Sequence, residues 1–193
     1  MLILMTFFKE HPSVSVVMLL LGLQAIVLYL LQHPVICTCG YVKIWEGVVR
    51  SAGNSQHLFD WYTFSHVIHG FLFFGFFTYF YPRAPLWQRL ALALGIEVGW
   101  EIIENTPYII ALYREQALAV GYSGDSIINS LCDSIVMIGG FLFASRFPAR
   151  LVIVIALVME LAVGYYIRDN LTLNVLNFVH RFEIVDEWQR TAP

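Results

Sequence analysis

Charged residues are scarce in this sequence: only 13% of its 193 residues are Asp, Glu, Lys or Arg, whereas 59% are hydrophobic. Ordinary soluble domains carry about 25% charged and about 45–50% apolar residues, so this composition argues against a soluble fold. No run of Lys or Arg occurs, and 11 basic against 14 acidic residues give a net charge of −3. Because phosphate binding needs clustered cations, we expect no nucleic-acid partner. Aromatic residues make up 16%, which excludes a disordered chain. A small membrane protein remains.

Residues 13–32 lack any charged side chain. About 20 apolar residues cross the hydrocarbon core of a bilayer, so this stretch predicts a membrane-spanning helix. Its apolar part is too long for a signal peptide and no small-x-small cleavage site precedes Cys37, so we expect a retained anchor. The same criterion predicts four more spans, over residues 61–81, 86–110, 126–144 and 151–167.

The predicted fold is all-α, a polytopic membrane helix bundle of about five transmembrane helices plus a C-terminal amphipathic helix. The last helix is indicated by apolar residues that recur after Asp169, namely Leu173, Leu176, Val179 and Phe182. We expect a single integral-membrane domain over residues 1–193, with an outer loop at 33–60 and an interfacial tail at 168–193. The sequence shows no internal repeat, and so lacks the symmetry typical of inverted-repeat transporters.

Basic residues predict the orientation of these spans. The loops at 82–86 and 145–150 are short, carry Arg83, Arg146 and Arg150, and fall on the same side as the N-terminus. Short basic loops face the cytoplasm. The sequence therefore predicts a cytoplasmic N-terminus and a C-terminus on the outer side, although the Arg residues of the tail oppose this bias.

One face of the third span is acidic. Glu97, Glu101 and Glu104 lie at i, i+4 and i+7. At about 100° per residue, these three side chains fall within an arc of roughly 60°. Tyr108 continues the same stripe. Ionisable groups inside a bilayer cost roughly 2.5–3.5 kcal/mol each, so this face predicts a functional site.

Two further helices contribute polar groups at a similar depth. His66 and His69 lie near the start of the second span, and Asp125, Asn129 and Asp133 lie at i, i+4 and i+8 around the start of the fourth. Both helices enter from the outer side, whereas the third runs toward it, so three helices bring polar side chains to one level. The residues at that level are His66, His69, Glu101, Glu104, Asp125 and Asn129, while Glu97 and Asp133 lie nearer the middle. This agreement predicts a polar cavity that opens to the outer leaflet and is capped by the outer loop.

Three interpretations of this polar level stay open. Imidazole nitrogens with carboxylate oxygens suit a divalent Zn, Mn or Fe ion, and the candidate ligands are His66, His69, Glu101 and Asp133. Alternatively, two carboxylates held together in a low dielectric share a proton, which suits a general acid or base as well as a proton-coupled carrier. The third is a structural network in which protonated carboxyls and imidazoles tie the helices together.

Cysteine is rare, with three residues at positions 37, 39 and 132. Cys132 lies within a span and is expected to be inert. Cys37 and Cys39 follow the first span on the outer side, where an oxidising compartment seldom leaves thiols free. A disulfide across one intervening residue is strained, so both a disulfide and a thiolate metal site stay open.

Several strings resemble an uncharacterised family of bacterial multi-pass inner-membrane proteins of unknown function, and the resemblance covers nearly the whole chain. The strings are CTCG (37–40), NSQH (54–57), DWY (60–62), SHVIHG (65–70), WEIIENTP (100–107) and GDSIINS (124–130). The resemblance implies a bacterial inner membrane, and hence a periplasmic C-terminus, but it implies no activity.

A fainter resemblance is to the VanZ-like membrane proteins associated with glycopeptide resistance. The positions that match are Asp60, His66, Glu101, Glu104, Asp125, Asn129 and Gly139. The chain departs from that pattern in three ways: the spacing from Asp60 to His66 is longer, Glu104 stands where Gln is common, and the cysteine-containing loop has no counterpart. This resemblance supports only the outward polar cavity.

The leading hypothesis is an integral-membrane enzyme that hydrolyses or transfers a lipid or lipid-linked head group at the outer leaflet. The candidate catalytic residues, which bind a metal, activate water or orient the substrate, are Glu101, Glu104, Asp125 and Asn129.

Three more residues are candidate substrate contacts. Arg114, in the loop after the third span, is placed to meet a phosphate, and Asp60 and Tyr108 are the other two. A covalent serine mechanism is not supported, because Ser65 and His66 face about 100° apart on a helix.

The main alternative is a small proton- or cation-coupled carrier, which with so few spans would have to form a homodimer. Transport needs polar groups that continue to the cytoplasmic side, whereas the third span has only apolar residues between Arg89 and Glu97. This favours the enzyme. A further alternative is a non-catalytic accessory or assembly protein whose acids are structural.

Overall fold

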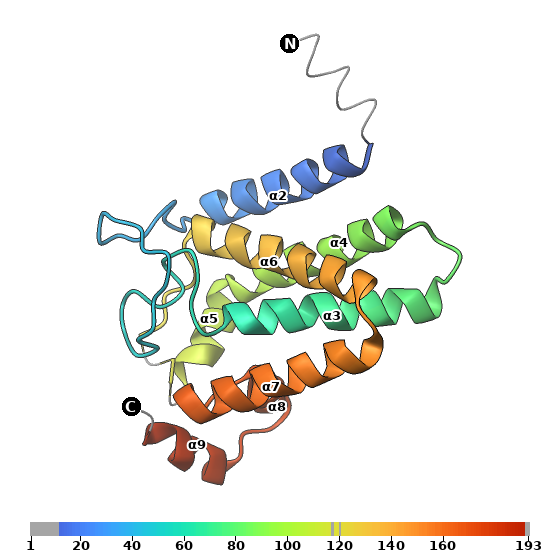
Figure 1. Ribbon diagram of the computed structural model, residues 1–193. Helices are drawn as coiled ribbons and strands as arrows, with labels where there is room; N and C mark the ends of the chain where they lie inside the picture. Colours follow the sequence, from blue (N-terminus) through green and yellow to red (C-terminus); the bar gives the residue numbers. More distant parts are fainter. Residues whose placement is uncertain (1–11, 117, 120, 192–193) are drawn as a thin grey trace.

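Apolar runs of 18–20 residues form the five long helices of the described chain. The computed structural model describes residues 12–116, 118–119 and 121–191, and this part is all-helical apart from loops and one isolated β-bridge between Trp45 and Phe59. Its helices (Figure 1) are α2 (Pro12–Leu30), α3 (Thr63–Phe80), α4 (Leu86–Glu104), α5 (Pro107–Arg114), α6 (Ile127–Arg146), α7 (Ala149–Ile167), α8 (Leu171–Val179) and α9 (Glu183–Arg190). The predicted helix bundle is confirmed.

The long helices lie side by side and alternate in direction (Figure 1), and α3 and α6 form the closest pair. Glycines meet where these two helices cross. A Cβ atom added to Gly70 would lie 2.3 Å from the carbonyl oxygen of Met137, and one added to Gly140 would lie 2.4 Å from that of Val67. Small residues let two backbones approach closely. Gly70 and Gly140 therefore lie where the backbones of α3 and α6 come closest together.

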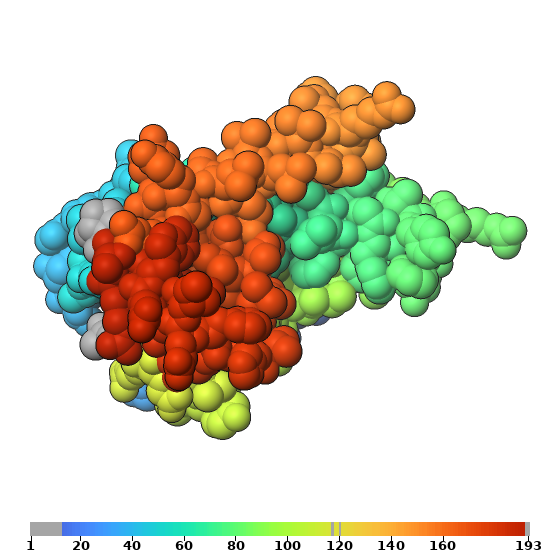
Figure 2. Space-filling model, turned by 90° about the horizontal axis from the view of Figure 1, so that it is seen from below, coloured from blue at the N-terminus to red at the C-terminus, as the bar shows by residue number. Residues whose placement is uncertain are grey.

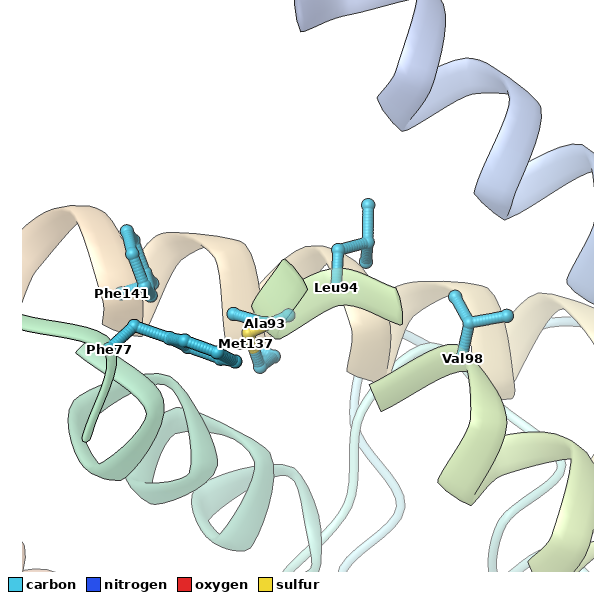
Figure 3. Close-up of a cluster of buried hydrophobic side chains, with 6 residues drawn as sticks. All are labelled: Phe77, Ala93, Leu94, Val98, Met137 and Phe141. Carbon is cyan, nitrogen blue, oxygen red and sulfur yellow. The ribbon is translucent and has the colours of Figure 1, made fainter. Parts of the chain in front are cut away.

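An apolar core fills the space between α3, α4 and α6. Its buried members (Figure 3) are Phe77, Ala93, Leu94, Val98, Met137 and Phe141. The peripheral helices α2 and α7 expose large apolar side chains such as Leu19 (72% exposed) and Leu161 (73%). Such exposed apolar faces need an apolar surrounding, which a bilayer supplies.

Within the described residues, three helices are long and apolar enough to cross a membrane: Ser13–Leu30, Ile127–Arg146 and Ala149–Ile167. This supports membrane association, with fewer candidate spans than the sequence predicted. The difference arises because α4 carries Arg89 and three Glu residues and α3 carries two His residues. The N-terminal end of the chain, at residues 1–11, lies outside the described residues.

The loop between α2 and α3 covers one end of the bundle. Its residue Ser55 accepts a hydrogen bond from Ser126 N at 2.9 Å, and Gln56 Nε2 donates to Gly124 O at 2.7 Å, so the loop lies over the start of α6. A disulfide joins Cys37 and Cys39 within this loop. The helices α8 and α9 lie at the same end (Figures 1 and 2).

The predicted span at 86–110 is wrong in its length, because the helix breaks into α4 and α5. The Asn105 side chain donates a hydrogen bond back to Glu101 O at 2.9 Å. Pro107, which lacks a backbone N–H, then starts α5, and the Thr106 hydroxyl caps it.

The tail likewise forms two short helices, not one. Glu160 of α7 accepts hydrogen bonds from the backbone N–H groups of Leu171 and Thr172 at 3.1 and 3.0 Å, which caps the start of α8. The tail still exposes apolar side chains, with Val179 81% exposed. The end of α9 is held instead by Gln189, which is 1% exposed.

Candidate functional site

Two imidazoles of α3 meet one carboxylate of α4. His66 Nδ1 lies 2.6 Å from Glu97 Oε1, and His69 Nδ1 lies 3.0 Å from Glu97 Oε2. A proton on Nδ1 of each ring lets both imidazoles donate to Glu97 and leaves a lone pair on each Nε2. Glu97 is 0% exposed. It therefore orients both rings inside the bundle.

Glu101 lies one helical turn further along and is 1% exposed. Its Oε2 accepts a hydrogen bond from Ser130 Oγ at 2.6 Å. Its Oε1 lies 3.3 Å from His66 Nδ1 and accepts no hydrogen bond. A buried carboxylate oxygen without a hydrogen-bond donor is costly, so this atom needs a cation or a proton.

Gln24 of α2 supports the same carboxylate from behind. Its Nε2 donates to Ser130 Oγ at 2.7 Å and to Ser130 O at 2.9 Å, and its Oε1 accepts from Ser134 Oγ at 2.9 Å. Gln24 is 0% exposed. The chain of hydrogen bonds from Gln24 through Ser130 fixes the position of Glu101.

Asp133 of α6 completes the group. Its Oδ2 lies 3.9 Å from His66 Nε2, and its Oδ1 accepts a hydrogen bond from Thr63 Oγ1 at 3.3 Å. One ligand atom from each of His66, Glu101 and Asp133 lies within 4.8 Å of the others, and the same holds for His66, His69 and Glu97. Imidazole nitrogens with carboxylate oxygens at this spacing fit a divalent Zn, Mn or Fe ion. We call these five residues the His/carboxylate cluster.

A second polar cluster lies at the break between α4 and α5. Asn105 Nδ2 donates to Asp125 Oδ2, and Asp125 N donates to Asn105 Oδ1, both at 2.7 Å. Tyr122 Oη donates to Asp125 Oδ1 at 2.8 Å, and His33 ring nitrogens lie 3.0 and 2.9 Å from the backbone oxygens of Asp125 and Asn105. Burial raises the pKa of Asp125.

Glu104 and Asn129 stand beside these clusters. Glu104 Oε1 accepts a hydrogen bond from Tyr113 Oη at 2.8 Å, and a ligand atom of Glu104 lies within 4.8 Å of ligand atoms of Glu101 and Asp125. Asn129 is 1% exposed, and its Nδ2 has no hydrogen-bond partner. Asn129 precedes Asp133 by one helical turn and so shares its face of α6.

The three predicted substrate contacts, Asp60, Arg114 and Tyr108, do not form one site. Asp60 is 2% exposed and accepts hydrogen bonds from the backbone N–H groups of Tyr62 and Ser55, and burial raises its pKa to about 6. Arg114 is exposed, and its Nε donates to Tyr122 O. Tyr108 is 72% exposed and leaves the acidic stripe, because the helix breaks before it.

The His/carboxylate cluster is closed to solvent, not open. Glu97, Glu101 and Asp133 are 0%, 1% and 4% exposed, and the less buried of the two imidazoles in the His/carboxylate cluster is His69, with a side chain 16% exposed. The predicted open cavity is therefore wrong for the described residues, because the loop between α2 and α3 covers this end. Two hollows on the described surface are apolar and lie elsewhere, one of about 400 Å³ between α3, α6 and α7 and one of about 690 Å³ between α2 and α4.

Some residues of the site had weak signals in the sequence. Gln24 is the lone amide in an otherwise apolar helix, which marks it as a polar contact inside the bundle. Glu97 belongs to the acidic stripe, but its role as the acceptor for both imidazoles depends on how α3 and α4 pack. The contacts of His33 and Asn105 depend on the loop path, which no spacing rule predicts.

The amino-acid sequence is similar to those of a protein family of unknown function. A family model described as "Protein of unknown function (DUF2585)" matches residues 28–191. A UPF0314 protein of Rhizobium etli is 54% identical over 166 residues, which cover 86% of this chain and 85% of the relative. UPF0314 proteins of Agrobacterium fabrum (50% over 174 residues, 90% of this chain and 88% of the relative) and Sphingopyxis alaskensis (48% over 170 residues, 88% and 90%) are also similar. No solved structure matches the chain.

Proposed function

Because the chain belongs to the DUF2585 family, whose description assigns no function, we propose an activity from the site itself: an intramembrane, metal-dependent enzyme that hydrolyses or transfers a lipid or lipid-linked head group at the outer leaflet. The observation that carries this proposal is Oε1 of Glu101, which accepts no hydrogen bond and is buried beside His66 and Asp133. A divalent ion would satisfy that oxygen and would supply a Lewis acid for hydrolysis or transfer.

The roles follow from the contacts. His66, Glu101 and Asp133 are the proposed metal ligands, with His69 as a further one. Glu97 is a positioning residue, since a carboxylate that accepts the Nδ1 proton directs the Nε2 lone pair of an imidazole. Carboxylates of the cluster also move protons in such a site, because a buried acid–base pair exchanges a proton readily.

The second polar cluster supports a substrate with a polar head. Glu104 ends α4 and lies near Asp125, and Tyr122, which donates to Asp125 through its hydroxyl, accepts a hydrogen bond from the exposed Arg114 through its backbone oxygen. A guanidinium at that place suits a phosphate group. Asn129, whose Nδ2 is unpaired, is the proposed orienting donor. The partly exposed His69 marks the side from which a head group reaches the cluster.

We propose a bacterial inner membrane, five crossings and an N-in, C-out orientation as the setting of this site. Five helices of 18–20 residues lie side by side, and the ionisable groups of α3 and α4 face inward. The short basic turns at 82–86 and 145–150 both lie at the end of the bundle opposite the long loop (Figure 1), which supports this orientation. The resemblance to VanZ-like proteins stays a prediction.

A carrier has less support. Between Arg89 and Glu97, α4 offers only apolar side chains, so no polar path leads from the cluster to the basic end. A purely structural role for the acids predicts that they bind no metal.

The proposal is tested with the full-length protein in detergent, incubated with bacterial phospholipid extract and Zn²⁺, Mn²⁺ or Fe²⁺, with released head group measured by mass spectrometry. Wild type and the control Glu115→Gln, an exposed acid, release head group; Glu101→Gln does not. Equal release by Glu101→Gln, or no release by metal-loaded wild type, contradicts the proposal.

A further inference from the structure

The outer loop carries a second cluster of reactive groups, which lies outside the His/carboxylate cluster. Cys37 and Cys39 are joined by a disulfide, and a ring nitrogen of His57 lies within 4.8 Å of both sulfurs. The two sulfurs differ in access: Cys37 is 4% exposed, whereas Cys39 is exposed. In this form the sulfurs are bonded to each other, so they are not thiolate ligands of a metal.

This disulfide contributes little to the stability of the fold. A disulfide stabilises mainly by closing a loop of the unfolded chain, and the effect grows with loop length. Here only one residue separates the two cysteines. The long loop is held instead by other contacts, including the hydrogen bonds of Ser55 and Gln56 to the start of α6. A structural role therefore does not account for the pair.

The surroundings favour one direction of attack. The backbone N–H of Cys39 donates to Cys37 Sγ at 3.2 Å, and such a donor stabilises a thiolate on Cys37. A stabilised thiolate is a better leaving group in thiol–disulfide exchange. The His57 ring stacks on Tyr41 with centroids 5.6 Å apart, and its Nδ1 accepts from Lys43 N at 3.2 Å, which holds the turn that presents Cys39.

We propose that Cys37 and Cys39 form a redox-active pair that exchanges its disulfide with a protein or peptide dithiol on the same side of the membrane. A partner thiolate attacks Cys39 Sγ, the Cys37–Cys39 bond breaks, and Cys37 leaves as a thiolate. The second partner thiolate then attacks the partner sulfur of the mixed disulfide and releases Cys39. The partner dithiol is oxidised to a disulfide, Cys37 and Cys39 are reduced, and the two partner protons pass to them. Exchange with another protein disulfide regenerates the pair.

The first test uses the full chain with Cys132→Ser, in detergent, equilibrated with mixtures of reduced and oxidised glutathione and then alkylated for mass analysis. The proposal predicts that the pair passes from oxidised to reduced within the range of glutathione mixtures, and that the oxidised protein converts a reduced two-cysteine peptide to its disulfide in equal amount. A pair that stays oxidised in excess reduced glutathione, and is reduced only after denaturation, overturns it.

A matched pair of variants tests the assigned direction in the same background. Cys37→Ser keeps the exposed Cys39, and Cys39→Ser keeps the buried Cys37. With oxidised glutathione, the Cys37→Ser protein is expected to form the mixed disulfide faster, on the order of tenfold. Equal rates in the two variants, or no mixed disulfide in either, contradict the assignment.

Discussion

Glu97 and His66 approach to 2.6 Å between Oε1 and Nδ1, although they come from different helices and are 0% and 7% exposed. A buried carboxylate needs a partner, and the Nδ1–H of His66 supplies a hydrogen bond to Glu97. The same carboxylate holds His69 at 3.0 Å. Glu97 thus orients two imidazoles, and a metal-binding His requires such support from a hydrogen-bond acceptor.

Gln24 is linked to the proposed metal ligand Glu101 through Ser130, so we expect replacement of Gln24 to weaken metal binding. In Gln24→Leu, Ser130 loses its donor and Glu101 is held less firmly. Loss of a hydrogen bond that supports a metal ligand weakens metal binding by about 10–100-fold. Titration of the metal-free protein with Zn²⁺ or Mn²⁺ measures this, and Gln88→Leu, at an exposed amide on α4, serves as the control. Equal affinity in the two variants would refute the role given to Gln24.

The glycine contact between α3 and α6 predicts opposite results at two neighbouring positions. In Gly140→Ala the new methyl group would lie 2.4 Å from Val67 O, so the helices must separate, at a cost of about 1–3 kcal/mol. In Gly139→Ala the methyl group meets nothing within 4 Å, and the better helix propensity of Ala adds up to about 1 kcal/mol. Unfolding in detergent compares the two. A stable Gly140→Ala protein would mean that the crossing is looser than described.

The buried Asp169 predicts that the tail is held less firmly at high pH. Burial raises the pKa of Asp169 to about 7, from 3.8, while its oxygens accept from Tyr62 Oη and Gln189 Nε2. The docked form therefore binds more protons, so the contribution of Asp169 protonation to docking falls as pH rises from 3.8 to about 7 and is absent above about 7. Hydrogen-exchange protection of Glu183–Arg190, corrected for intrinsic rates, should fall across this range.

Asp169→Asn is the matched control for that experiment, since the amide stays neutral at every pH. Its protection factors should not change between pH 5 and 8 beyond those of the rest of the protein. If wild type and Asp169→Asn follow the same pH dependence, the loosening belongs to another group.

The sequence predicts the helices well where apolar runs decide them, and less well where single polar contacts decide them. The ends of α3, α6 and α7 fall within a few residues of the predicted spans. The break after Glu104 was missed, because apolar residues continue past it and only the Asn105 side chain and Pro107 stop the helix.

In the candidate site, too, some features follow from helical spacing and others from contacts between distant residues. Helical spacing alone brings Glu97 and Glu101 to one face, and a similar depth predicts that His66 lies beside Glu101, 3.3 Å away in the structure. The same reasoning places Glu97 and Asp133 nearer the middle of the bundle, yet both approach His66, to 2.6 and 3.9 Å. Helical spacing does not indicate whether the cluster is shielded from water. That the cluster is closed follows from the path of a long loop that returns over α6, and such paths depend on contacts between residues far apart in the sequence.

The metal site is tested most directly by the metal content of the full-length protein, purified in detergent at neutral pH without chelator and measured by elemental mass spectrometry. We expect one Zn, Mn or Fe per chain, or a stoichiometric multiple, in wild type and in Glu115→Gln. We expect loss of that metal in both Glu101→Gln and His66→Gln, with each variant still folded. A folded wild type without metal, or metal retained in both variants, would contradict the central claim that the His/carboxylate cluster is a metal site.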